Sequence, residues 1–121
     1  MTDLPTPSDL VSLMIEAARS LEEAQSELVG ASRTAAESER LYRQSRAQAW
    51  LTATEGTAEQ KKDHVSAITA DRAYRAHLDD ALAKAALELV RSRRATLSAY
   101  QSISNAVRAE FDLARTGPEG Y

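Results

Sequence analysis

Arginine is the residue type in this chain whose spacing best suits a chemical role. Two groups stand out, one at steps of three and one in a tight cluster: Arg40, Arg43, Arg46, Arg91, Arg93 and Arg94. A guanidinium group is planar, always charged and able to hold two phosphate oxygens at once. The pattern therefore predicts a surface for phosphate groups. Arginines on helices also commonly serve solubility and pairing with glutamate, and that interpretation stays open.

The predicted nucleic-acid-binding surface gathers residues from two helices. In an antiparallel hairpin that turns near residue 56, residues 40–46 face about 66–72, where further arginines lie. Tyr100 follows the second arginine group and offers a ring on which a base can stack. The predicted surface comprises Arg40, Arg43, Arg46, Arg72, Arg75, Lys84, Arg91, Arg93, Arg94 and Tyr100.

Residues typical of enzymes are sparse. The chain has no cysteine, and its 4 glycines are isolated, so it has neither a thiol nucleophile nor a glycine-rich phosphate loop. His77 has Asp80 one turn later, but a surface histidine is the preferred interpretation. We expect a non-enzymatic protein with no catalytic residue, no metal site and no cofactor.

Helices must position these side chains. No proline lies between residues 8 and 117, and alanine, the best helix former, is abundant. Thr6 and Pro7 offer a helix start, Gly56 and Thr57 offer a turn followed by a new N-cap, and Gly117-Pro118 offers an end.

We therefore predict an all-α, coiled-coil-like helical hairpin. It comprises a leader at 1–7, one domain at 8–116 and a tail at 117–121. Within the domain, one helix covers about 8–54, a turn covers 55–57 and a second helix covers about 58–115. We expect the first helix to continue through Gly30, because its apolar phase runs straight through this position.

The first helix carries one continuous heptad seam. Steps of four and three select only apolar or small residues: Leu10, Met14, Ala17, Leu21, Ala24, Leu28, Ala31, Ala35, Ser38, Tyr42, Ser45 and Ala49. Such a repeat is typical of helices that wrap around each other in a left-handed supercoil.

The second helix carries two apolar stripes. One contains Leu78, Leu82, Ala85, Leu89, Ser92, Thr96, Ala99, Ile103 and Ala106, and the other contains Leu87, Val90, Leu97 and Phe111. The first helix can cover only one of them. The other must contact a second subunit or a folded-back part of the chain. We prefer a homo-oligomer and assign its interface to Leu87, Val90, Leu97 and Phe111.

Charge and hydropathy suit a cytoplasmic protein. Residues 1–39 hold 2 basic and 8 acidic groups, net −6, whereas residues 40–115 hold 13 basic and 9 acidic groups, net +4. This asymmetry is consistent with an anionic partner. The N-terminus lacks a basic region followed by an apolar run, and no apolar stretch reaches the ~18 residues of a membrane span, so we expect no membrane partner.

Two segments resemble the UvsY-like phage recombination mediator family. They are residues 41–51, around Tyr42, Arg43 and Arg46, and residues 89–102, around Arg91, Arg93 and Arg94. The similarity covers roughly residues 30–115, and the acidic helix at 8–39 departs from the pattern. It implies an oligomer in a bacterial host cell that binds single-stranded DNA. It also implies interplay with single-strand-binding protein and help in loading a recombinase or annealing protein.

Two other functions stay open. The heptad seams alone would explain a protein-only assembly module, such as a coiled-coil adaptor, a chaperone or a virion component. A small secreted helical hairpin of the Trp-x-Gly type would fit the length, but Trp50 is followed by Leu51 and Thr52, with no glycine at the required place.

Overall fold

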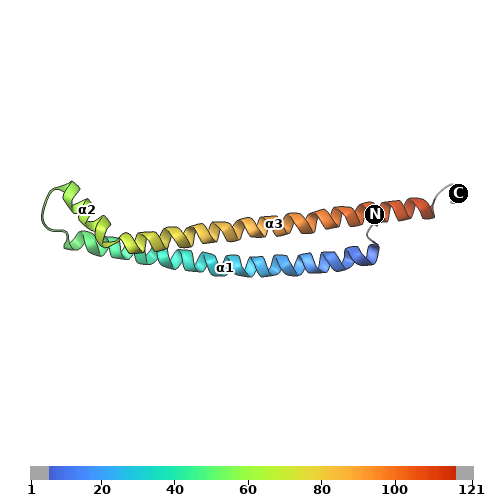
Figure 1. The fold of residues 1–121 in the computed structure, drawn as a ribbon, viewed down its shortest axis with the longest axis horizontal. Helices are drawn as coiled ribbons and strands as arrows, with labels where there is room; N and C mark the ends of the chain where they lie inside the picture. Colours follow the sequence, from blue (N-terminus) through green and yellow to red (C-terminus); the bar gives the residue numbers. More distant parts are fainter. Residues whose placement is uncertain (1–5, 117–121) are drawn as a thin grey trace, which may run out of the picture. The chain divides into compact units, whose positions relative to one another are not determined.

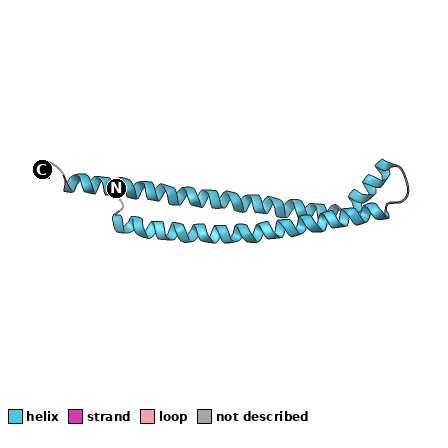
Figure 2. Ribbon diagram, turned by 180° about the vertical axis from the view of Figure 1, so that it is seen from behind, coloured by secondary structure: helices cyan, strands magenta, loops and turns pink. Residues whose placement is uncertain are grey.

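The computed structural model describes residues 6–116, which form three helices and no strand (Figures 1 and 2). They are α1 (Pro7–Thr52), α2 (Ala58–Ile68) and α3 (Ala70–Arg115). The prediction of an all-α helical hairpin is confirmed, because α1 and α3 pack against each other in opposite directions. The predicted tail at 117–121 and the first five residues of the predicted leader lie outside the described residues.

The chain divides into two compact units. Unit 1 combines the described parts of Met1–Gln25 and Glu88–Tyr121, and therefore holds the start of α1 and the end of α3. Unit 2 is Ser26–Leu87, and holds the rest of α1, all of α2 and the start of α3. Within each unit the segments of α1 and α3 run antiparallel.

Both predicted helix starts are confirmed by reciprocal hydrogen bonds. The Thr6 hydroxyl accepts from the Asp9 backbone N–H at 3.1 Å, and an Asp9 carboxylate oxygen accepts from the Thr6 N–H at 3.1 Å. At α2, the Thr57 hydroxyl accepts from the Gln60 N–H at 3.2 Å, and Gln60 Oε1 accepts from the Thr57 N–H at 3.0 Å. Each box satisfies backbone donors that a helix start leaves without partners.

Gly56 and Gly30 behave as predicted, Gly56 at the turn between helices and Gly30 within a continuous helix. Gly56 has a φ of 98°, the left-handed conformation that lets the chain turn between α1 and α2. Helix α1 continues through Gly30 without interruption. An added Cβ at Gly30 would meet no atom within 4 Å, so no packing contact in this chain requires glycine there.

The predicted single helix over 58–115 needs a correction, because the structure breaks it at Thr69. Thr69 has φ −97° and ψ 7°. Its hydroxyl donates to the Val65 carbonyl at 2.7 Å, and its backbone N–H donates to the same oxygen at 3.0 Å. A threonine that bonds back to the preceding turn bends a helix. The bend places both Val65 and Thr69 in the core of unit 2, 2% and 3% exposed.

The seam predicted on α1 is the face that α1 buries. All twelve of its residues are buried or half-buried, with Leu10 and Ala24 each only 2% exposed. The facing residues of α3 include Ala76, Asp79 and Val90, which are also buried. The many small side chains on both helices allow a close approach.

The structure corrects one part of the predicted use of the two stripes on α3. Val90, 3% exposed, and half-buried Leu97 pack within their own chain, so Val90 is not available for the subunit interface that we assigned to it. The other stripe, through Ser92, Thr96 and Ile103, is left exposed. Leu87 and Phe111 remain 37% and 58% exposed.

Candidate nucleic-acid and assembly surfaces

Four of the nine lysine and arginine residues of unit 2 pair with acids on their own helix. Arg40 contacts Glu37 through two hydrogen bonds, of 2.6 and 3.0 Å, and Arg43 Nε lies 2.8 Å from Glu39. The hydrogen bonds from Arg40 lower the pKa of Glu37, and the same contact raises the pKa of Arg40. Lys84 likewise lies 2.9 Å from Asp80 Oδ2. The pairs are exposed and three or four residues apart, so each contributes little to stability.

The structure does not gather all the arginines of unit 2 into one patch. Arg72 and Arg75 line a cleft of about 440 Å³ together with Arg33, which the sequence analysis did not select. Arg40, Arg43 and Arg46 do not line this cleft. Arg33 belongs to the acidic first part of the chain, and only the packing of α1 against α3 brings it beside the other two.

A buried carboxylate lies in the wall of the same cleft. Asp79 is 4% exposed, and it accepts a hydrogen bond from the Ser38 hydroxyl of α1. Arg75 Nε lies 3.5 Å from Asp79 Oδ2, but the Arg75 side chain is 68% exposed. A buried carboxylate requires such partners, because an isolated buried charge is very costly. Ser38 and Asp79 therefore fix how α1 and α3 align in unit 2.

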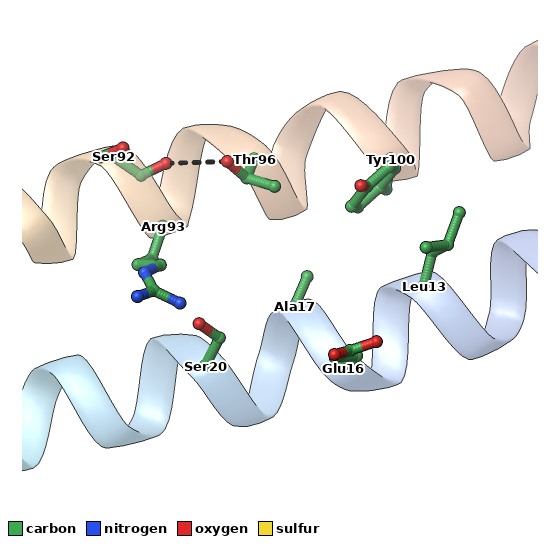
Figure 3. Close-up of a pocket in the computed structure, with 8 residues that line it drawn as sticks. All are labelled: Leu13, Glu16, Ala17, Ser20, Ser92, Arg93, Thr96 and Tyr100. Carbon is green, nitrogen blue, oxygen red and sulfur yellow. Dashed lines mark hydrogen bonds between the residues drawn. The ribbon is translucent and has the colours of Figure 1, made fainter.

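A second cleft, of about 370 Å³, lies between α1 and α3 in unit 1 (Figure 3). Arg93 and Tyr100 line it from α3, and Ser20 and Glu16 line it from α1. The Arg93 side chain extends from α3 towards Ser20 on α1. Ser20 Oγ is buried and has no hydrogen-bond partner among residues 6–116. Tyr100 is half-buried here, which leaves part of its ring accessible.

The tight arginine cluster on α3 is divided between two faces. Arg93 lies at the cleft, whereas Arg91 and Arg94 are exposed and belong to a different stripe of the helix. Steps of three and four residues continue that stripe as Arg91, Arg94, Ser98, Gln101, Asn105 and Arg108, all exposed. We call these six residues the polar face of α3. Four of the six, Ser98, Gln101, Asn105 and Arg108, were not among the residues predicted from the sequence, although their spacing was a usable signal.

Few of the guanidinium groups of unit 1 are engaged. Arg91 Nη1 lies 2.6 Å from Glu88 Oε1, and both side chains are more than half exposed. Arg93, Arg94 and Arg108 form no ion pair with any residue between 6 and 116. No acidic residue occurs between Glu88 and Glu110, so the polar face carries only positive charge and neutral hydrogen-bonding groups.

An exposed stripe of small and apolar side chains follows α3 beside the clefts that α3 forms with α1. In unit 1 it comprises Leu89, Ser92, Thr96, Ala99, Ile103 and Ala106, of which only Leu89 is half-buried and the rest are exposed. We call these six residues the apolar face of α3. In unit 2 the same heptad phase holds Leu78 and Leu82, 37% and 54% exposed. Exposed apolar residues that recur at heptad spacing are typical of a helix that packs against another helix.

The described residues offer no group of three or more His, Cys, Asp or Glu side chains that could hold a metal ion. Over the same part of the chain, every helix is too short or too polar to cross a membrane. Comparison of the chain with protein-family models, with curated proteins and with solved structures found no match.

Proposed function

We propose that this protein binds single-stranded DNA through the polar face of α3, as an accessory factor of DNA recombination. The resemblance to UvsY-like mediators supports the recombination role. It also supports a phage or prophage origin, a homo-oligomeric state and a place in the bacterial cytoplasm. In this proposal the protein helps a recombinase or annealing protein to load, in the presence of single-strand-binding protein.

The composition of the polar face carries the proposal. The stripe from Arg91 to Arg108 carries three guanidinium groups, one hydroxyl group and two amide groups. Arginine, serine, asparagine and glutamine are the side chains that commonly contact phosphate and sugar. No carboxylate on this stretch would repel a phosphodiester backbone.

The ion pairs seen on other exposed arginines are compatible with this proposal. Exposed pairs such as Arg91–Glu88 and Arg43–Glu39 contribute about 0–1 kcal/mol each. A phosphate group can therefore replace the carboxylate at small cost. Arg94 and Arg108 need no such exchange, since neither is paired within the described chain.

The test is fluorescence anisotropy of a labelled single-stranded oligonucleotide at several salt concentrations. The Arg94→Ala/Arg108→Ala variant removes two unpaired charges, and Arg19→Ala/Lys62→Ala removes two exposed charges elsewhere as the matched control. Each phosphate contact on a single strand contributes ~0.7 to the slope of log K against log salt. We expect the first variant to bind more weakly and to lower the slope by roughly 1.4, and the control to behave as wild type.

Two outcomes would contradict the proposal. One is the absence of binding by the folded wild-type protein at low salt. The other is equal loss in the test and control variants, which would indicate an effect of net charge alone. Arg93→Ala separates the cleft from the polar face: we expect a smaller loss, because Arg93 lines the interhelical cleft and its side chain extends towards Ser20 on α1.

The exposed apolar stripe favours a second candidate, a protein-only assembly module. Ile103, 43% exposed, and its heptad neighbours would serve as a docking face for other helices, and the arginines would pair with acids of a partner. Stable complexes with a purified protein partner, combined with no affinity for nucleic acid, would favour this candidate.

A further inference from the structure

The cleft of unit 2 brings together three arginines from two helices. Arg33 lies on α1, and Arg72 and Arg75 lie about one turn apart on α3. The cleft, of about 440 Å³, falls in the range of roughly 300–1,000 Å³ that is usual for small-molecule sites. All of its lining residues belong to Ser26–Leu87, so one compact unit holds the whole site.

Both acids that line this cleft already have a basic partner. Glu37 accepts two hydrogen bonds from Arg40, which does not itself line the cleft. Asp79 is ion-paired with Arg75. The other two arginines of the cleft, one on each helix, form no ion pair with any residue between 6 and 116. Two positive charges therefore stay without a partner in the wall of one cleft, and a doubly charged anion would neutralise both.

The guanidinium groups are the hydrogen-bond donors that the cleft offers to a ligand. The hydroxyl groups are already committed, because Thr34 Oγ1 donates to the Gly30 carbonyl at 3.1 Å and Ser38 donates to Asp79. Arg75 approaches Asp79 through Nε, which leaves its two Nη groups for another partner. A ligand that binds here must therefore supply several acceptor oxygens.

We propose that the cleft of unit 2 binds a phosphomonoester dianion, carried either by a small molecule or by the end of a nucleic-acid strand. Such a group has a charge of about −1.5 to −2 at neutral pH and three strong acceptor oxygens, which guanidinium groups bind in pairs. An internal phosphodiester carries a single charge and has fewer free oxygens, so it cannot neutralise both unpaired arginines. Leu41, in the same wall, offers an apolar contact for the group that carries the phosphate.

This inference does not rest on DNA binding by the polar face of α3. No residue of the polar face lines the cleft, and the polar face belongs to unit 1. The two properties can therefore fail independently. A titration with a small phosphate ester contains no DNA, so its result stands whether or not the polar face binds a strand.

Methyl phosphate and dimethyl phosphate provide a matched pair of probes. At about pH 8 the monoester is a dianion, whereas the diester keeps one charge. Each is titrated into ¹⁵N-labelled protein at constant ionic strength, and the arginine Nε–H resonances are followed by NMR. We expect methyl phosphate to shift the resonances of Arg33 and Arg72 saturably, and dimethyl phosphate to bind about 10-fold more weakly, because it engages one guanidinium group fewer.

Single substitutions test whether the cleft holds the phosphate. Arg33→Gln and Arg72→Gln each remove one unpaired guanidinium group, from different helices. Arg46→Gln is the matched control: Arg46 also lies on α1 in unit 2, is exposed and forms no ion pair within residues 6–116, but does not line the cleft. We expect each test variant to bind methyl phosphate about 10-fold more weakly, and the control to bind it as wild type does. All three positions are exposed, so the helices should stay intact, which far-UV circular dichroism checks.

A pair of oligonucleotides distinguishes the two sources of the phosphate. One has a 5′-phosphate and the other a 5′-hydroxyl, both carry the fluorophore at the 3′ end, and both are titrated with the Arg94→Ala/Arg108→Ala variant. Tighter binding of the phosphorylated strand, abolished by adding Arg33→Gln, would assign the site to strand ends. Equal binding of the two strands, together with saturable binding of methyl phosphate, would assign it to a small molecule.

Three results would overturn the proposal. The first is the absence of saturable shifts with methyl phosphate in the folded wild-type protein. The second is equal affinity for methyl phosphate and dimethyl phosphate, which would show that the cleft does not select a dianion. The third is an equal loss in Arg33→Gln and Arg46→Gln, which would indicate an effect of net charge alone.

Discussion

The contact between Ser38 and Asp79 is the polar link whose removal should destabilise the fold most clearly. Ser38→Ala deletes the hydroxyl that donates to the carboxylate of Asp79, a residue that is 4% exposed. Arg75 Nε remains 3.5 Å away, but its exposed side chain cannot replace a donor located inside the helix interface. A hydrogen bond to a charged group contributes about 1.5–3 kcal/mol, so we expect a loss of this size in the free energy of unfolding.

The double variant distinguishes this link from general packing. Asp79→Ala removes the buried charge together with its requirement for a donor, and adding Ser38→Ala to it should then cost little. The coupling between the two substitutions should be on the order of 1–2 kcal/mol. Arg75→Ala is the control: its exposed pair with Asp79 should contribute less than about 1 kcal/mol.

Urea unfolding followed by far-UV circular dichroism measures the wild-type protein and all four variants. The protein concentration must be held constant, because the proposed self-association would make apparent stability concentration-dependent. A Ser38→Ala variant within about 0.5 kcal/mol of wild type would refute the reasoning, since surface substitutions alone cause changes of that size. Additive effects of the two substitutions would refute it as well.

Further expectations concern single positions and pH. Gly30→Ala should raise the free energy of unfolding by about 0.5–1 kcal/mol in the same urea assay, because the helix continues through Gly30 and an added Cβ meets no atom within 4 Å. Gly56→Ala should lower the free energy of unfolding by at least about 1 kcal/mol. The φ of 98° disfavours any residue other than glycine, and the new Cβ would lie 2.6 Å from Gln60 Oε1 of the α2 capping box. The hydrogen bonds from Thr6 lower the pKa of Asp9. The Asp9 carboxylate at the start of α1 therefore contributes fully to stability above the ordinary aspartate pKa, and this contribution is lost as the pH falls through the lower pKa of the folded state. An NMR titration of the Asp9 carboxyl carbon checks the direction, and a midpoint at or above that of an unstructured peptide would contradict it.

Much of the architecture could be read from local rules. The helix starts at Thr6 and Thr57 and the turn at Gly56 follow from capping chemistry and from the backbone freedom of glycine, which operate within a few residues. The α1 seam follows from the heptad period, because a helix with one apolar stripe has only one face to bury.

Only the tertiary structure decided the remaining features, because each depends on contacts between distant segments. Helix α3 has two apolar stripes, and the position of α1 decides which of their residues are buried. Val90 is buried, whereas Ile103 stays exposed. The break at Thr69 depends on placing Val65 in the core. Ser38 and Asp79 are 41 positions apart in sequence, and no local pattern indicates that they meet.

The candidate site divides in the same way. The arginine types and spacing that predict phosphate binding are local, and the polar face of α3 follows from steps of three and four along one helix. That Arg93 and Arg94 lie in different surroundings cannot be predicted from the local sequence. Neighbouring positions on a helix point about 100° apart, so the placement of α1 alone determines that Arg93 lies at the interhelical cleft and Arg94 faces solvent.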